Sequence, residues 1–144
     1  MSYKKRGIDF LEIEWKTYIE RFNRLPKEEG LKRVNGQGYA QFRDMLAHVL
    51  AWWDEGMGII LAIAENREFE RKKYDFAVFN AEAVAKYKDW DETEFLNQFE
   101  KMRVKYAEDL KPVDEAVFEN RRVRVWINGS FIHHAREHLV TLSK

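Results

Sequence analysis

Apolar residues recur every three or four positions in four stretches of the chain, which is the pattern of an amphipathic α-helix. The stretches cover about residues 8–22, 41–64, 91–110 and 131–142. Charged side chains fill the positions between the apolar ones, except in the second stretch, which is the most apolar. The pattern therefore predicts four long helices, each with one buried face.

Turn-forming and capping residues separate these stretches. Pro26 ends the first, and Asn-Gly-Gln-Gly at 35–38 marks a turn before the second. Asp91, followed by Glu94 three residues later, has the spacing of a capping box at the start of the third. Lys-Pro at 111–112 ends that helix.

The segments between the helices predict shorter elements. Residues 66–73 are mostly charged and predict a solvated connection, after which Asn80 can cap a short helix that extends to Tyr87. At 122–127, valine and isoleucine alternate with arginine and tryptophan, which predicts a short extended stretch. Asn-Gly-Ser at 128–130 then predicts a turn before the last helix.

The helices and their connections predict an all-α fold. With 144 residues and 45% hydrophobic content, the chain can close one core, so we expect a single domain over residues 1–144. Four long amphipathic helices, with a long connection between the second and the third, are typical of a four-helix bundle.

Charge and composition limit the partners and the compartment. The chain has 25 basic and 25 acidic residues, so it lacks the positive field that attracts nucleic acid, and we expect no nucleic-acid partner. The longest apolar stretch, 45–64, contains His48, Asp54 and Glu55, which favours a buried helix over a membrane span. Residues 1–10 do not resemble a signal peptide, and cysteine is absent. We therefore expect a cytoplasmic protein without a membrane partner.

The four histidines lie on only two of the predicted helices. His134 and His138 are four residues apart and share one helix face, at the flank of the buried stripe, and His48 has the same position on the second helix. Three such imidazoles can hold a divalent ion and leave positions open for water or substrate. His133 points away, beside Glu137. The alternative is that all are ordinary boundary residues, satisfied by tyrosine, glutamate or water.

Other residues are candidates for supporting roles, each with a plainer alternative. Asp44 lies one turn before His48 and could hold its second ring nitrogen, or it is simply a charge in the first helical turn. Trp52 could form a pocket wall, although its spacing also suits the core, and Glu55 could act as a general base. The basic run at 121–124 could bind an anionic substrate or face solvent. No nucleophile stands out, so the catalytic residues are unknown.

Specific motifs make the chain resemble a known family. The order of the predicted elements, FRDMLAHVLAW at 42–52 and HAREHL at 134–139 resemble the DinB/YfiT-like family. FNAEAV at 79–84 and Asp-Trp at 89–90 resemble its ClbS/DfsB branch in particular. The resemblance extends over nearly the whole chain. It implies a four-helix bundle of DinB/YfiT-like type, often homodimeric.

The resemblance also implies a function and a cofactor. Many members bind a divalent ion through one histidine on the second helix and an HxxxH pair on the fourth, positions that fall on His48, His134 and His138. This implies a metal-dependent hydrolase or transferase acting on a small-molecule substrate, with zinc or nickel favoured by imidazole ligands. Thiol-transferase members follow the last ligand with Arg-Gly-Gln, whereas Leu-Val-Thr at 139–141 follows here, which argues against thiol transfer.

The ClbS/DfsB branch implies an alternative. Its named member is associated with protection against a genotoxin through cyclopropane opening, and proteins of this type need not carry a metal. The chain would then be a metal-free detoxification or ligand-binding protein. Its pocket would be lined by four tryptophans: Trp15, Trp52, Trp53 and Trp126.

Overall fold

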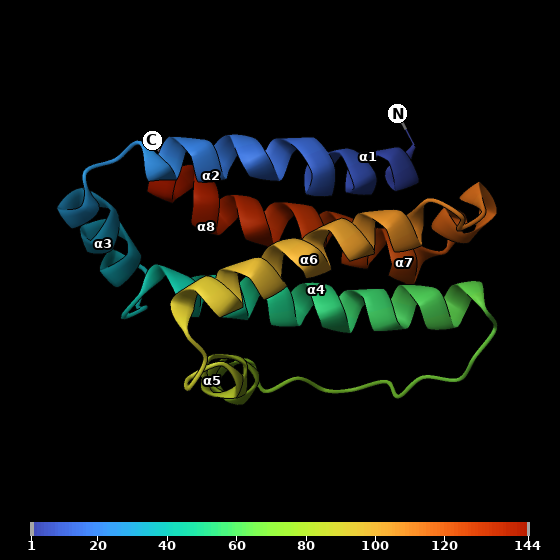
Figure 1. Ribbon diagram of the computed structural model, residues 1–144. Coiled ribbons are helices and arrows are strands. Elements are labelled where there is room, and N and C mark those ends of the chain that lie inside the picture. Colours follow the sequence, from blue (N-terminus) through green and yellow to red (C-terminus); the bar gives the residue numbers. More distant parts are fainter. Residues whose placement is uncertain (1, 144) are drawn as a thin grey trace.

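The computed structural model describes residues 2–143, and within that range it contains helices and no strand (Figure 1). The predicted all-α class is therefore confirmed. In chain order the elements are α1 (Tyr3–Asp9), the π-helical η1 (Phe10–Glu14), α2 (Trp15–Asn23), α3 (Lys27–Gly36), α4 (Phe42–Ala64), α5 (Phe76–Lys86), α6 (Glu92–Leu110), the 3-10 helix η2 (Glu115–Glu119), α7 (Arg121–Val125), the π-helical η3 (Trp126–His133) and α8 (His134–Ser143).

Four long helical segments lie along a common direction and enclose the core (Figure 1). The first is the continuous helix α1–η1–α2, the second α4, the third α6 and the last the continuous helix α7–η3–α8. The first segment packs on α6 through η1 and on α8 through α2, while α4 packs on α6 and on η3. Each long segment thus has two long neighbours, and α5 lies across α4.

One aromatic side chain from each long segment meets at the centre of the core. The Trp53 ring lies 4.9 Å from Trp15, 5.6 Å from Phe99 and 6.2 Å from Phe131, measured between ring centroids. All four are at most 2% exposed. Burial of such large apolar rings is the main stabilising term for a helix assembly of this size. Trp15 and Trp53 therefore belong to the core and line no pocket beside the histidines, contrary to the alternative described above.

The prediction of an extended stretch at 122–127 is wrong, because these residues form α7 and the start of η3. Asn120 caps the helix through its side-chain oxygen, which accepts from the backbone N–H groups of Arg122 and Val123. Val123 and Ile127 are fully buried while Val125 is 59% exposed. The two buried residues are thus four positions apart, as on one face of a helix. Over so short a run, the same two positions also fit the two-residue alternation of a strand. The predicted turn at 128–130 is likewise part of η3.

Two helices outside the long segments differ from the prediction. Nothing in the pattern at 27–36 indicated α3, which is short and starts directly after Pro26. The connection after α4 is non-helical through Asp75, and α5 begins at Phe76, with Asp75 rather than Asn80 as its cap. The predicted cap of α6 is confirmed, since the Asp91 carboxylate accepts from the Glu94 backbone N–H.

The apolar helix α4 is an internal helix of the molecule. By length and composition it could cross a membrane, but 67% of its most apolar window is buried among the other helices. A core helix of a soluble protein has these properties, which is consistent with the prediction from its internal charges.

Two glycines of α4 should respond oppositely to alanine. A Cβ at Gly56 would lie 3.0 Å from both Phe131 and Trp126, whereas one at Gly58 would meet nothing within 4 Å. We expect Gly58→Ala to raise the free energy of unfolding by about 0.5–1 kcal/mol through helix propensity. Gly56→Ala should lower it by about 1 kcal/mol, because overpacking outweighs that gain. Chemical denaturation of both variants measures the difference, and equal stability would contradict the close packing of η3 on α4.

Candidate metal centre and adjoining pocket

The contact between α4 and the last helix brings three of the histidines together. Gly56 allows the rings of Phe131 and Trp126 to approach the α4 backbone. One turn earlier on α4, the Trp52 carbonyl accepts a hydrogen bond of 3.1 Å from the Ser130 hydroxyl. Because η3 leads directly into α8, these contacts set the rotation of α8 about its axis. His134 therefore faces α4.

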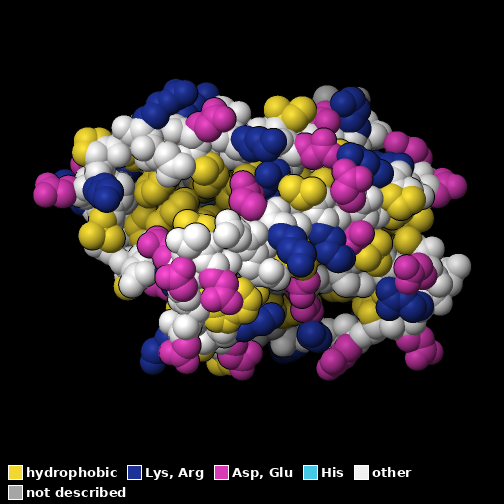
Figure 2. Space-filling view, in the orientation of Figure 1, with side chains coloured by type: hydrophobic (Ala, Val, Ile, Leu, Met, Phe, Trp, Pro, Cys, Tyr) yellow, Lys and Arg dark blue, Asp and Glu magenta, His cyan; other side chains and the backbone are white. Residues whose placement is uncertain are grey.

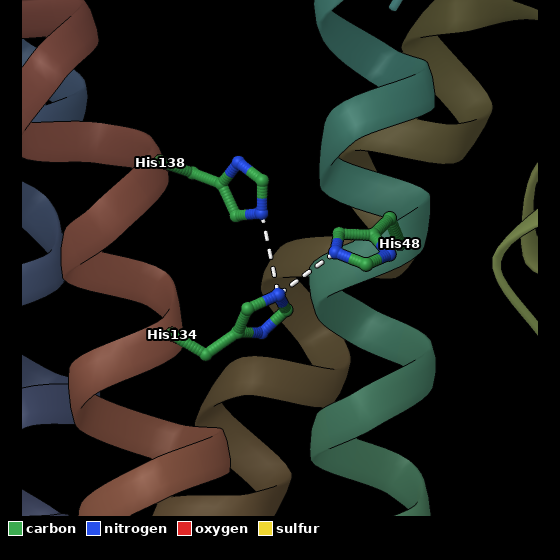
Figure 3. Close-up of side chains that lie close together, drawn as sticks. All are labelled: His48, His134 and His138. Carbon is green, nitrogen blue, oxygen red and sulfur yellow. Dashed lines mark hydrogen bonds between the residues drawn. The ribbon is translucent and has the colours of Figure 1, made fainter. Parts of the chain in front are cut away.

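The three imidazoles converge through their Nε2 atoms (Figure 3). His134 Nε2 lies 2.8 Å from His48 Nε2 and 3.2 Å from His138 Nε2. Potential ligand atoms of the three residues all lie within 4.8 Å of one another. Two imidazole nitrogens bound tetrahedrally to one zinc ion would be about 3.3 Å apart. The three residues are therefore close enough to hold one metal ion.

Gln37 fixes the protonation of His138. The Gln37 side-chain oxygen lies 2.6 Å from His138 Nδ1, and its amide nitrogen donates to the His138 backbone carbonyl at 2.9 Å. Since an amide oxygen only accepts, Nδ1 carries the proton of the neutral ring and Nε2 keeps its lone pair. Histidines that bind metals are usually held in this way by an outer partner.

With neutral rings, the two contacts at His134 Nε2 cannot both be good hydrogen bonds. His138 Nε2 can only accept, so that contact needs a proton on His134 Nε2. The single N–H of His134 can then point at only one of its two neighbours. If His48 carried its proton on Nε2, that proton would point at the N–H of His134. His48 is 3% exposed, and its Nδ1 has no hydrogen-bond partner among the described residues. A cation between the three Nε2 lone pairs would resolve this conflict.

Burial keeps all three rings neutral at physiological pH. It is the largest cause that lowers the pKa of His48 to about 3, and the charges of His134 and His138 act in the same direction. Burial and the charge of His138 lower the pKa of His134 to about 4. The pKa of His138 is also lowered, again by burial. The rings are thus in the unprotonated form that binds metals.

A pocket of about 660 Å³ adjoins the three histidines. Its walls come from the connection between α3 and α4, from α4, from the connection before α5, from α5 itself and from the last helix. Besides the histidines, the lining residues are Tyr39, Trp52, Tyr74, Phe76, Asn80, Val125, Trp126, Gly129, Ser130 and Glu137. The histidine cluster therefore has access to a space the size of a small molecule.

The structure places the other candidate residues as follows. Trp52 lines the pocket, as expected for a wall residue. Asp44 does not reach His48: its carboxylate accepts from the Gln41 backbone N–H at 3.1 Å and so caps α4, which is its alternative role. Glu55 does not line this pocket but accepts from the Tyr74 hydroxyl at 2.8 Å and pairs with Lys72. Glu55 lies two helical turns after His48 on α4, so its carboxylate is directed to Tyr74 and Lys72 and not to the histidines.

Of the remaining candidates, His133 is exposed and its Nε2 atom lies 3.0 Å from a carboxylate oxygen of Glu137, as its position on the helix predicted. The basic run at 121–124 does not line the pocket. Arg122 lies over the Phe69 ring, and Arg124 pairs with Glu119. These cations are therefore occupied elsewhere.

Several residues at the site were not found from the sequence. Gln37 lies in the turn after α3, and the Tyr39 ring lies 5.6 Å from His48 and 5.9 Å from His138. Burial raises the pKa of Tyr39, so its hydroxyl is protonated. Asn80, which suggested a helix cap, lines the pocket and accepts from Trp52 Nε1 at 2.9 Å. No spacing or motif links these residues to the histidines.

A second cavity lies at the other side of the core. Figure 2 shows it as an apolar hollow between α2, α3 and α6. It is lined mainly by apolar side chains, including Phe22, Leu31 and Leu96, and by no histidine. This cavity lacks the metal-binding groups of the first.

Comparison of the chain with protein-family models, curated proteins and solved structures found no match.

Proposed function

We propose that the protein is a metal-dependent hydrolase or transferase acting on a small molecule, with a divalent ion held by His48, His134 and His138. The observation that carries this proposal is the convergence of three neutral imidazole nitrogens beside a pocket. The hydrogen bond from His138 to Gln37, which turns a lone pair toward the other two rings, supports it further.

Zinc and nickel are among the ions that imidazole ligands favour. When bound by three protein ligands, such an ion lowers the pKa of a water molecule and polarises a carbonyl group at its open positions. The protein's part is to hold the three rings neutral and oriented, and to admit a substrate through the adjoining pocket.

We also propose that the chain has the DinB/YfiT-like helix arrangement. The order of the four long segments and the long connection from α4 to α6, which contains α5, support this. So do the places of His48 on the second long segment and of the HxxxH pair on the last. The homodimer and the cytoplasmic location that we expect from the sequence belong to the same proposal.

A metal-free detoxification or ligand-binding protein of the ClbS/DfsB type is the second candidate. The observation that favours it is the aromatic lining of the pocket, which includes Trp52 and Trp126 as this alternative expects. Such a protein would bind its ligand through ring contacts alone.

Metal analysis of protein purified without an affinity tag separates the two candidates. We expect about one zinc or nickel ion per chain, and a lower melting temperature after treatment with a chelator, because an ion that binds only the folded state stabilises it. Protein that cannot be loaded with either ion, and whose melting temperature a chelator leaves unchanged, would contradict the metal-dependent function and favour the second candidate.

A further inference from the structure

We propose that the pocket beside the histidines selects a neutral aryl group that carries a carbonyl-type oxygen, with the ring against the aromatic wall and the oxygen at the ion. This inference rests on the proposed function and names its substrate class. Aryl esters, aryl amides and related aryl carbonyl compounds belong to this class.

The aromatic wall is assembled from separate segments of the chain. Trp52 of α4 lies 5.6 Å from Phe76 of α5 and 6.3 Å from Trp126 of η3, between ring centroids. Tyr74, in the connection before α5, lies 6.1 Å from Trp126. The Trp52 ring is also 6.5 Å from that of His134. An aryl group on this wall therefore lies next to the metal-binding nitrogens.

Two residues of this pocket expose large apolar surfaces to water. Phe76 is 65% exposed and Val125 is 59% exposed, and both line the pocket. Exposed apolar side chains that gather at a cavity are typical of a binding site, because a ligand can cover them. Burial of a ring against Phe76 would gain both apolar area and a ring-to-ring contact.

Away from the ion, the pocket as the structure describes it offers no positively charged partner to a substituent on the ring. No lysine or arginine is among the described residues that line it, so the protein itself offers no counter-ion to an anionic substituent. Its carboxylate, Glu137, contacts His133. A divalent ion on three neutral imidazoles keeps its double positive charge, which disfavours a cationic ligand.

A hydrogen-bond donor stands in the same pocket. The Asn80 side-chain oxygen accepts from Trp52 Nε1, which leaves the NH₂ group of that amide as the donor for a ligand. Asn80 and the three histidines line the same pocket. A ligand in this pocket can therefore accept a hydrogen bond from this donor.

Two hydroxamic acids test the aryl selectivity. Both bind zinc through the same two oxygens, but only benzohydroxamic acid carries a ring. We expect zinc-loaded protein to bind benzohydroxamic acid at least about tenfold more tightly than acetohydroxamic acid, measured by calorimetry, because the ring buries apolar area on the aromatic wall. Equal affinities would overturn the proposal.

Three variants locate the ring. Phe76→Ala should reduce the preference for benzohydroxamic acid over acetohydroxamic acid to about twofold or less. It should leave the affinity for acetohydroxamic acid unchanged. Val78→Ala is the matched control, because Val78 is 51% exposed on the same helix and does not line the pocket. Leu96→Ala alters the second cavity and should also have no effect. A preference that depends on Leu96 and not on Phe76 would contradict the proposed subsite.

Benzamide and acetamide test the subsite without the ion. In metal-free protein we expect benzamide, and not acetamide, to change the tryptophan fluorescence, and Phe76→Ala to abolish the change. If zinc fails to bind but this response is present, the proposed function fails and the aryl subsite stands. If zinc binds but neither aryl probe is preferred, the aryl subsite fails and the metal centre stands.

Discussion

Replacing His134 by alanine should lower the affinity of the protein for zinc by more than about a hundredfold. His134 Nε2 is the central atom of the cluster, within 2.8 Å and 3.2 Å of the other two Nε2 atoms. Without it, only His48 and His138 remain, on different helices. Loss of an outer-sphere partner typically costs 10–100-fold in affinity, and loss of a ligand exceeds that. Competition with a chromogenic chelator measures the change.

Two further variants make this result specific. His133→Ala removes a neighbouring imidazole whose side chain is 74% exposed and lies beside Glu137, away from the other three histidines, so zinc affinity should not change. Gln37→Leu leaves the three ligands but frees the His138 ring, and should weaken zinc binding by about 10–100-fold. Stoichiometric zinc that persists at unchanged affinity in His134→Ala would refute the three-histidine site.

Truncation of Trp53 should be the most destabilising change in the core. We expect Trp53→Ala to lower the free energy of unfolding by about 3–5 kcal/mol, through lost apolar burial and the cavity that remains. The side chain is fully buried and contacts rings from all three other long segments, at Trp15, Phe99 and Phe131. Denaturant-induced unfolding followed by circular dichroism measures this loss.

Trp53→Phe provides the comparison. Phenylalanine retains a ring at the centre of the core, so Trp53→Phe should lower the free energy of unfolding clearly less than Trp53→Ala does. The Trp53 Nε1 atom has no hydrogen-bond partner among the described residues, so its removal sacrifices no bond. A loss below about 1 kcal/mol for Trp53→Ala would contradict the central position of this side chain.

The pairing of the histidines was predictable because helix geometry alone relates residues four apart. The same period did not separate Trp53, which lies at the centre of the core, from Trp52, which lines the pocket. It did place His133 on the exposed face. The period failed at 122–127, where six residues fit both a strand and a helix, and the burial of Val123 and Ile127 decides for the helix.

The outer partner of His138 was not predictable. Gln37 follows a short helix that lacks a strong apolar stripe, and it is about a hundred residues from His138 in the sequence. Asp44 was the nearer candidate for a partner of the site, but its carboxylate satisfies the backbone N–H of Gln41 at the start of α4. A side chain such as that of Asp44 can either cap its own helix or contact a distant residue, and the sequence does not show which of the two interactions forms.

By itself, the sequence determined the helical class, three of the four long segments together with residues 131–142 of the last, and the faces on which His48, His134 and His138 lie, because each depends only on the period of a helix. The tertiary structure decided that the three Nε2 atoms meet, that Gln37 orients one of them, and that Trp52, Phe76 and Trp126 form a wall beside them. These features depend on how α4, α5 and α8 are rotated and packed against one another. Close contacts, such as those at Gly56, set that packing, and no local pattern records it.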